Sequence, residues 1–415
     1  MAFQFNFTPD ILDVSDDESQ MGMSVEHNHA DAPVKGTAAN IPERPCQEFT
    51  LDLHRLPPAL HLDPIVFHDN DHARAIYRRQ LNDVKFQLAQ EDTMLGEDQT
   101  DLHGPITPAT APVRYAQFLQ QVESTDLISG EYEGGMKTWE CSIDLLRYLA
   151  QHRNTLPLEG KRILELGCGS GLPSIFCLQE TERAEVHLQD YNFEVVELIT
   201  QPNVLANLLW SLPRPEGDSP VSVSLETHPE PTEAIGEAEK APMANADKGK
   251  APADAHDDGD ESDDDGEMEV EEEDSDDDEP RLPTIHVTDR DQPALLARFT
   301  ALTRRCRLFA GDWSKLAPYL AGSAPIEASG HQYDLILTSE TIYSQASQLK
   351  LYAAIRALLR PGGVALIAAK SVYFGCDGNV HTFARLVEER GEFRLTTVAT
   401  YGSHLRREVI RMEFL

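Results

Sequence analysis

The sequence predicts an α/β fold in which one doubly wound sheet of seven strands has helices on both faces. Three observations support this prediction. Short apolar runs, typical of buried strands, alternate along the chain with segments that have apolar residues at helical spacing. A glycine-rich loop follows the first of these runs and leads directly into a helix-like segment. The last two apolar runs have no helix between them, which predicts a C-terminal antiparallel hairpin at the sheet edge.

These patterns place the individual elements. The predicted strands are residues 163–166, 186–189, 307–310, 333–338, 364–369, 395–401 and 408–414. The predicted helices are residues 142–152, 172–178, 193–212 with an interruption at Pro202, 293–303, 348–359 and 380–390. Residues 115–122 are interpreted as a further strand or a short helix. The helix at 348–359 is expected to end there because Pro361 and two glycines follow it.

The domain organisation follows from where periodicity is lost. We expect a globular domain over residues 113–415, preceded by a largely disordered N-terminal region, residues 1–112, which is mostly polar and interrupted by prolines. Within that region residues 3–7, with three alternating Phe, could form a docking strand, and residues 74–90 a helix. Residues 213–283 have no periodicity and are predicted to be a disordered acidic insertion between two core elements.

The negative charge is concentrated in these segments. Of the formal net charge of −36, residues 254–279 contribute 18 acids and no Lys or Arg, and residues 1–112 contribute a net −12, leaving −6 for the rest. Because the sequence has no clustered Lys and Arg, we expect no direct binding to nucleic acid. The acidic block is either a solvated loop or a binding segment for basic ribosomal or histone partners.

The six cysteines are scattered and form no Cys-x-x-Cys pair, which predicts buried free thiols and no metal site. The N-terminus does not resemble a signal peptide. No segment approaches the roughly 18 apolar residues that a membrane span needs. We therefore expect a protein of the cytoplasm and nucleus that does not insert into a membrane. As a separate expectation, it is a monomer.

The stretch at 162–192 carries the first chemical signal. Leu-Glu-Leu-Gly-Cys-Gly-Ser-Gly at 164–171 joins a strand to a helix, and the next strand ends at Asp190, which suits a ribose diol. The glycine spacing is not that of dinucleotide binders, and no Lys-Ser/Thr follows as in a P-loop. Glu165 would repel a pyrophosphate but tolerate a cationic methionine group. The stretch therefore predicts an S-adenosylmethionine site, with a helix N-cap as the alternative role of Asp190.

Other strand ends are expected at the same rim, because ligands of doubly wound sheets bind beyond the carboxyl ends of the strands. The four segments predicted to meet there are residues 167–171, Asp190, residues 312–313 and residues 339–343. Their convergence is a stronger signal than any of the motifs alone.

Several motifs resemble those of the histidine protein methyltransferases, Rossmann-like enzymes that modify a large-subunit ribosomal protein. They are Gly-Glu-Tyr-Glu-Gly-Gly at 130–135, Trp-Glu-Cys at 139–141, Gln-Asp-Tyr-Asn at 189–192, Leu-Thr-Ser-Glu-Thr-Ile-Tyr at 337–343, Tyr-Phe-Gly at 373–375 and Phe-Gln-Phe-Asn-Phe at 3–7. The resemblance covers about residues 113–212 and 300–415 and the first seven residues. It does not cover the acidic insertion or most of residues 8–112.

The resemblance implies a protein-L-histidine N-methyltransferase (EC class 2.1.1) that uses S-adenosylmethionine and acts on a ribosomal protein in translation. The positions that match the methyl-donor contacts of the family are Thr138, Trp139, Glu140, Cys141, Ser142, Gly167, Gln189, Asp190, Tyr191, Gly311, Asp312, Trp313 and Ser339. The residues themselves indicate matching roles. Glu165 and Gly167, with Gly169 and Gly171 of the same loop, would bind the methionine portion, Asp190 the ribose, and Asp312 and Trp313 the adenine.

For the catalytic step we expect alignment to matter more than a strong base, because a histidine with a pKa of about 6.5 is mostly neutral in the cell. Glu340 would accept the N–H of the substrate imidazole and fix its tautomer, while Tyr343 and Tyr373 shape the slot. The alternative is that Glu340 caps the following helix. Trp139 is either part of a lid over the methionine group or a core anchor.

Two other functions stay open at this point. A protein-lysine methyltransferase of the same fold is not excluded by residues 339–343. A non-catalytic chaperone would use the acidic insertion to bind a basic ribosomal protein. Methylation of RNA or small molecules is less well supported, because the chain has no Asn/Asp-Pro-Pro-Tyr motif and no basic stripe.

Overall fold

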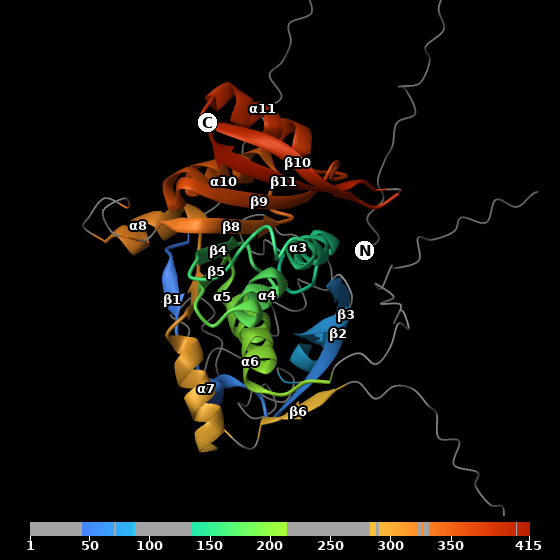
Figure 1. Cartoon of the computed structure of the whole chain (residues 1–415), viewed down its shortest axis with the longest axis vertical. Coiled ribbons are helices and arrows are strands. Elements are labelled where there is room, and N and C mark those ends of the chain that lie inside the picture. The colour runs from blue at the N-terminus through green and yellow to red at the C-terminus, as the bar shows by residue number, and fades with distance from the viewer. Residues whose placement is uncertain are drawn as a thin grey trace, which may run out of the picture. The chain divides into compact units, whose positions relative to one another are not determined.

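The computed structural model describes residues 44–69, 72–85, 87, 134–213, 283–287, 290–322, 326, 330, 332–403 and 405–415 (Figure 1). The predictions for residues 1–43 and 115–122 and for nearly all of the acidic insertion lie outside these residues. None of the helices within them is long and apolar enough to cross a membrane.

An eight-stranded sheet with strand order β1-β7-β5-β4-β8-β9-β11-β10 forms the centre of the fold. Seven of its strands are those predicted from the sequence: β4 (Arg162–Leu166), β5 (Glu185–Asp190), β7 (Cys306–Ala310), β8 (Tyr333–Ser339), β9 (Leu359–Lys370), β10 (Phe393–Tyr401) and β11 (Arg407–Phe414). Strands β7, β5, β4, β8 and β9 are parallel, whereas β11 is antiparallel to β9 and β10. The predicted doubly wound sheet and C-terminal hairpin are confirmed.

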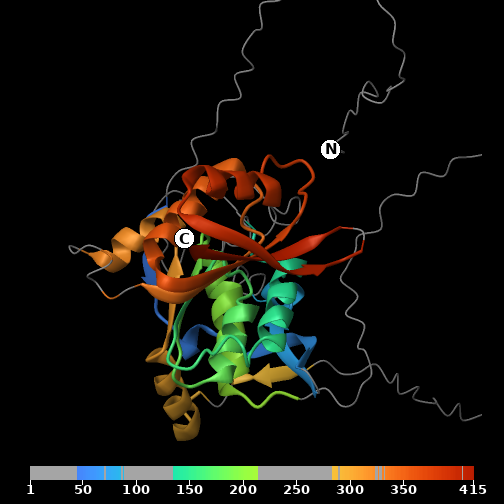
Figure 2. The same ribbon diagram turned by 45° about the horizontal axis from the view of Figure 1, so that its top comes forward.

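Helices cover both faces of this sheet (Figures 1 and 2). Ile163 of β4 belongs to one apolar core and its neighbour Leu164 to the other, as the pleat of a strand requires. The first core includes side chains of α3 (Glu140–Gln151), α4 (Leu172–Glu180), α6 (Gln201–Leu209) and α7 (Pro293–Thr303). The second includes side chains of α8 (Leu316–Ala321), α10 (Gln345–Leu358) and α11 (Val380–Arg390). Burial on both faces explains why these strands are continuous apolar runs in the sequence.

Residues 44–69 and 72–85 form part of the fold, which corrects the prediction that the globular domain begins near residue 113. They form β1 (Gln47–Phe49), the short helix η1 (Leu53–Arg55), β2 (Ala59–Asp69) and β3 (His72–Arg79). Strands β3 and β2 form a second sheet with β6 (Thr284–His286). The helix predicted at 74–90 is wrong over residues 74–79, which belong to β3, whereas residues 81–85 and 87 are helical and the other predicted positions lie outside the described residues. Phe67 and Ile76 of the hairpin are buried in the same core as α3 and α4, and this packing favours the strand.

The helix predicted at 193–212 contains a π-helical segment. α5 (Phe193–Val195) continues into η2 (Val196–Thr200) and then α6. Pro202 has no N–H to bond the carbonyl of Leu198, four residues earlier. Arg79 of β3 donates from Nη1 to that carbonyl at 3.0 Å. The helix can therefore continue past the proline because the N-terminal hairpin satisfies the freed group.

Strand β1 depends on a glycine at the end of β7. The N–H of Asp312 donates to the carbonyl of Arg44 at 3.1 Å, and a Cβ on Gly311, at φ +122°, would collide with the carbonyl of Pro45. We expect Gly311→Ala to displace β1 and lower the free energy of unfolding by about 2–4 kcal/mol. Gly362 is the matched control, because it has φ +77° but open space around it. Gly362→Ala should lower the free energy of unfolding by only about 1 kcal/mol. Denaturant titration measures both losses, and equal values would contradict this account.

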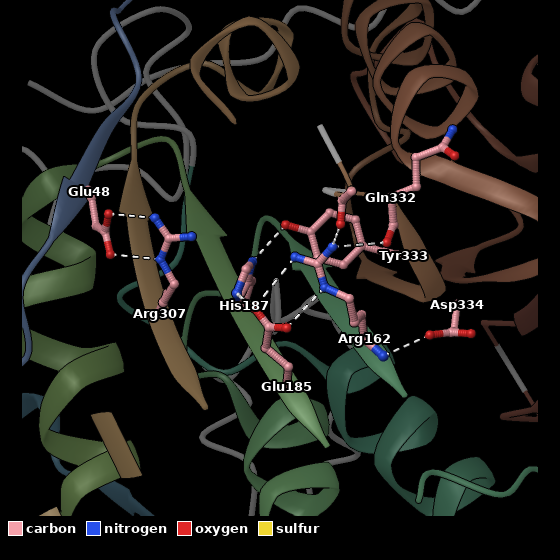
Figure 3. Close-up of polar contacts among 9 residues, drawn as sticks. Glu48, Arg162, Glu185, His187, Arg307, Gln332, Tyr333 and Asp334 are labelled. Carbon is pink, nitrogen blue, oxygen red and sulfur yellow. Dashed lines mark hydrogen bonds and ion pairs between the residues drawn. The ribbon is translucent and has the colours of Figure 1, made fainter. Parts of the chain in front are cut away.

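A buried polar network links the strands near their amino ends (Figure 3). His187 of β5 places Nδ1 2.7 Å from Tyr333 Oη and Nε2 2.9 Å from Glu185 Oε1, and Arg162 donates from Nε to Glu185 at 3.0 Å. Burial lowers the pKa of the His187 imidazole. The hydrogen bond from His187 lowers the pKa of Glu185 to about 2, although burial opposes it. His187 is therefore neutral at physiological pH.

Acid is expected to destabilise the fold through this network. The unfolded chain takes up a proton at His187 near pH 6.5, whereas the folded chain does so only at lower pH, so stability falls as the pH drops below about 6.5. Glu185 adds a second loss as the pH falls from about 4.5 toward about 2. Thermal melting from about pH 7.5 to about pH 5 measures the first effect. The melting temperature of His187→Gln should fall less steeply with decreasing pH than that of the wild type. Parallel curves of melting temperature against pH would count against the network.

Candidate functional site

The loops that follow β4, β5, β7 and β8 meet at one edge of the main sheet. Gly169 donates its N–H to Asp190 Oδ2 at 2.8 Å, and Gly311 donates its N–H to the Asp190 carbonyl at 2.9 Å. On the other side, Thr338 of β8 donates from Oγ1 to the carbonyl of Leu166 at 2.8 Å. The predicted convergence of these strand ends is confirmed.

The glycine-rich loop at 167–171 is held by η2 and α6. Thr200 donates from Oγ1 to the carbonyl of Gly169 at 2.6 Å, and Asn203 donates from Nδ2 to the carbonyl of Ser170 at 3.0 Å. The side chain of Asn203 also accepts the N–H of Arg79 in β3 at 2.6 Å. The N-terminal hairpin therefore supports the loop, a contact that the sequence did not indicate.

Glu165 is fully buried at the end of β4. Its Oε2 accepts the N–H of Ser174 in α4 at 3.0 Å. Burial raises the pKa of Glu165 to about 8, although the hydrogen bonds from Ser174 oppose the shift, so the carboxyl is mostly protonated at neutral pH. The prediction that its charge would repel a pyrophosphate is therefore wrong. Its Oε1 has no hydrogen-bond partner within the described ranges and could still bind a ligand group.

Asp190 is held in place by backbone groups. Besides the N–H of Gly169 on Oδ2, it accepts the N–H of Asn192 on Oδ1 at 3.2 Å. The N-cap of α5 is Asn192, so the alternative role of Asp190 as a helix cap is wrong. A carboxylate is a hydrogen-bond acceptor that suits hydroxyl groups, and the binding of ribose by Asp190 stays a prediction.

Asp312 and Trp313 follow β7 at the same edge, where a Cβ on Gly167 would lie 3.6 Å from the Trp313 ring. Asp312 accepts the N–H of Ser314 at 2.9 Å and the Nζ of Lys350 at 2.6 Å, so its carboxylate is already paired. Its hydrogen bond to adenine stays a prediction. Trp313 Nε1 and Gln189 Oε1 are buried atoms without hydrogen-bond partners in the part of the chain that the structure describes. Gln189 donates from Nε2 to the carbonyl of Gly311 at 2.6 Å, which fixes its unpaired oxygen at the rim.

Residues 138–142 lead into α3 next to the glycine loop. A Cβ on Gly169, at φ +49°, would lie 3.3 Å from the Cα of Gly135, so glycine allows the two loops to pack closely. Trp139 precedes the first residue of α3 and belongs to neither of the described apolar cores, which argues against the core-anchor interpretation. Cys141 and Ser142 are buried in the first turn.

Glu340 follows β8 in an unusual conformation. It is the only non-glycine residue with a positive φ in the described ranges, at +57°. Such strain persists only where the surroundings impose it, and it is concentrated at functional sites. Neither carboxylate oxygen has a hydrogen-bond partner among the described residues. The N-cap of α10 is Ser344, which forms a capping box with Ser347, so the helix-cap alternative for Glu340 is wrong.

Lys370, at the end of β9, is a residue of the candidate site that the sequence motifs did not indicate. Its Nζ is 3.6 Å from Glu340 Oε1 and 3.0 Å from Glu140 Oε2. Its N–H donates to Tyr373 Oη at 3.2 Å, and burial together with the charge of Glu340 raises the pKa of Tyr373. Tyr343 anchors the adjacent loop through its carbonyl, which accepts the N–H of Gly378 at 2.9 Å. Lys370 directly follows the apolar run 364–369, so the rule that selected the other strand ends could have found it.

The remaining predicted positions are near the same edge. Ser339 is the last residue of β8. The guanidinium of Arg44 lies over the ring of Tyr191, 5.0 Å from the ring centroid.

All six cysteines are free thiols, and four of them are buried, which confirms the prediction for most of them. Within the described ranges no group of three or more His, Cys, Asp or Glu side chains is placed to hold a metal ion.

Known proteins with similar sequences include several methyltransferases. The methyltransferase domain family matches residues 143–374, more than half of the chain. The histidine protein methyltransferase 1 homolog of Bos taurus is 32% identical over 290 residues, which are 70% of this chain and 58% of the bovine protein. Histidine protein methyltransferase 1 of Schizosaccharomyces pombe is 26% identical over 353 residues, 81% of this chain and 76% of that protein. The protein-lysine N-methyltransferase EFM3 of Chaetomium thermophilum is 34% identical over 86 residues, 21% of this chain and 25% of that protein. The chain thus spans about three-fifths of the length of the bovine relative.

Proposed function

The chain belongs to the methyltransferase domain family, and from that premise we propose that it transfers a methyl group from S-adenosylmethionine to a ring nitrogen of a histidine in a protein. The observation that supports this most is the buried Glu340 carboxylate, which a backbone at φ +57° holds at the rim, 3.6 Å from Lys370 Nζ and beside the Tyr373 side chain. A neutral imidazole needs one such acceptor for its N–H, which turns the other nitrogen toward the methyl group. The similarity to proteins named histidine protein methyltransferase, over 70% of the chain, supports the same acceptor.

The residues at the donor end fit S-adenosylmethionine. Asp190, held by the N–H groups of Gly169 and Asn192, places a carboxylate at the rim, and a carboxylate is the acceptor that ribose hydroxyls need. Trp313 Nε1, Gln189 Oε1 and Ser142 Oγ are buried and unpaired within the described ranges, as expected where a ligand supplies the missing partners. Glu165 can meet the methionine portion through its free oxygen. When bound, the cofactor supplies an electrophilic methyl group on a sulfonium.

The protein contributes mainly alignment to this reaction. Glu340 would accept the hydrogen bond of the protonated ring nitrogen, and Tyr343 and Tyr373 would shape the slot. These residues would hold the lone pair of the other nitrogen toward the methyl group that bound S-adenosylmethionine would supply, with the C–S electron pair left on its sulfur. The ring becomes cationic, and the Glu340 carboxylate would stabilise that charge until the ring proton passes to solvent.

The proposed substrate is a large-subunit ribosomal protein, with a role in translation and a location in the cytoplasm and nucleus. The motif resemblance at 130–135, 189–192 and 337–343 supports this choice. The enzyme is proposed to act as a monomer without direct nucleic-acid contact. The lack of a basic stripe in the sequence, with a formal charge of −6 outside the acidic segments, supports this part of the proposal.

Isolated large ribosomal subunits, incubated with the purified protein and S-adenosylmethionine labelled in its methyl group, test this proposal. After acid hydrolysis of the proteins, the label is expected in methylhistidine. Label in methyllysine would instead support a protein-lysine methyltransferase, the second candidate, which the 86-residue match to a lysine enzyme favours.

A further inference from the structure

Three side chains from two distant parts of the chain surround one ammonium group. Lys370 Nζ is 3.0 Å from Glu140 Oε2, 3.6 Å from Glu340 Oε1 and 5.2 Å from the centroid of the Trp139 ring. The side chain of Lys370 is only 15% exposed, so these contacts replace most of its hydration. We call Trp139, Glu140 and Glu340 the cation cage.

The cation cage has the chemistry of a receptor for an alkylammonium group. Carboxylates give charge-assisted hydrogen bonds, and the face of an indole attracts a cation within about 6 Å of its centroid. A lysine substrate would need a site of this kind to hold its side chain at the rim. Here the chain's own lysine fills it. The neighbouring Arg407, opposite Lys370 in the β9–β11 ladder, is engaged by Asp144, which accepts from its Nε at 2.5 Å.

We propose that Lys370 determines the acceptor specificity: by occupying the cation cage it excludes a cationic lysine and leaves Glu340 Oε2 for a neutral imidazole. This inference rests on the proposed function and adds to it the residue that separates histidine from lysine. A second ammonium beside Lys370 would meet like-charge repulsion when it enters a site with little water, whereas the imidazole enters uncharged and becomes cationic only as the methyl group is transferred.

Lys370 is a fixed occupant of the cage. Its backbone is held by β9 and by the hydrogen bond from its N–H to Tyr373 Oη. Burial opposes the charged form, but the carboxylates of Glu340 and Glu140 outweigh it and raise the pKa of Lys370 above its usual value. The ammonium therefore stays charged across the physiological pH range.

Lys370→Ala tests the inference by emptying the cage. With large ribosomal subunits and labelled S-adenosylmethionine, we expect methylhistidine to fall at least about tenfold and methyllysine to appear. Added ethylammonium, which can refill the cage, should restore methylhistidine. Lys370→Arg keeps the charge and should keep label out of methyllysine. Lys161→Ala removes an ammonium paired with Asp334 at 3.6 Å, near the amino end of β4, and should change neither product.

The outcomes separate the two proposals. Wild-type label only in methyllysine would overturn the proposed function. If the wild type forms methylhistidine, the role of Lys370 can be overturned separately. That happens if Lys370→Ala binds S-adenosylhomocysteine normally in calorimetry but forms no methyllysine, and if added ethylammonium does not change its yield of methylhistidine. If thermal melting shows that Lys370→Ala does not fold, Lys370→Gln gives the same comparison with an uncharged side chain of similar reach.

Discussion

Replacing Asp190 by alanine is expected to weaken the binding of S-adenosylmethionine at least about a hundredfold, which corresponds to about 2.7 kcal/mol. Two effects combine in this variant. The ribose hydroxyls lose their acceptor, and the N–H groups of Gly169 and Asn192 lose the carboxylate that now holds them at 2.8 and 3.2 Å. Hydrogen bonds to a charged group contribute about 1.5–3 kcal/mol each, so the loss of even two explains the size of the effect. Isothermal titration calorimetry with S-adenosylhomocysteine measures it.

Asp334→Ala is the matched control for this variant. Asp334 also accepts a backbone N–H, that of Arg162 at 2.8 Å, but near the amino ends of the strands (Figure 3). The control should lower the melting temperature without changing the affinity for the cofactor. An Asp190→Ala variant that is folded and binds as tightly as the wild type would remove Asp190 from the donor site.

Glu340→Gln is expected to slow methyl transfer by about 10²–10³-fold while the affinity for the cofactor stays within about twofold. The amide is nearly the same size as the carboxylate, but it cannot stabilise the cationic ring that forms on methylation. Single-turnover measurements with labelled cofactor separate this chemical step from binding. Glu388→Gln, on the outer helix α11, is the control and should leave the rate unchanged. An unaffected rate in Glu340→Gln would exclude Glu340 from the mechanism.

The main sheet and the donor end of the site could be predicted because both leave local signals in the sequence. Strands buried on both faces are short apolar runs, and the residues directly after them gather at one edge. That rule placed Gly169, Asp190 and Glu340 at the same rim although they are far apart in the sequence. Trp139 was placed there by its position before the glycine-rich unit and by the family resemblance.

The errors concern contacts between distant segments. β2 and β3 contain Pro64 and many charged residues, and they are strands because their apolar side chains pack against α3, α4 and α6. The pairing of β1 with β7 joins segments about 260 residues apart, which no local pattern indicates. The cation cage was missed for the same reason, because it forms only when the start of α3 meets the ends of β8 and β9. The charge predicted for Glu165 was wrong because burial raises the pKa of its carboxyl group, and the sequence does not show that this residue is buried.

The most direct test of the central claim is to map the methylated residue by tandem mass spectrometry after incubating large ribosomal subunits with the wild-type protein and S-adenosylmethionine, with Asp190→Ala as the blank. The proposed function predicts a gain of one methyl group, about 14 Da, on the imidazole of a histidine in a ribosomal protein, absent from the blank. A methyl group found on a lysine, or no difference between the wild type and the blank, would contradict it.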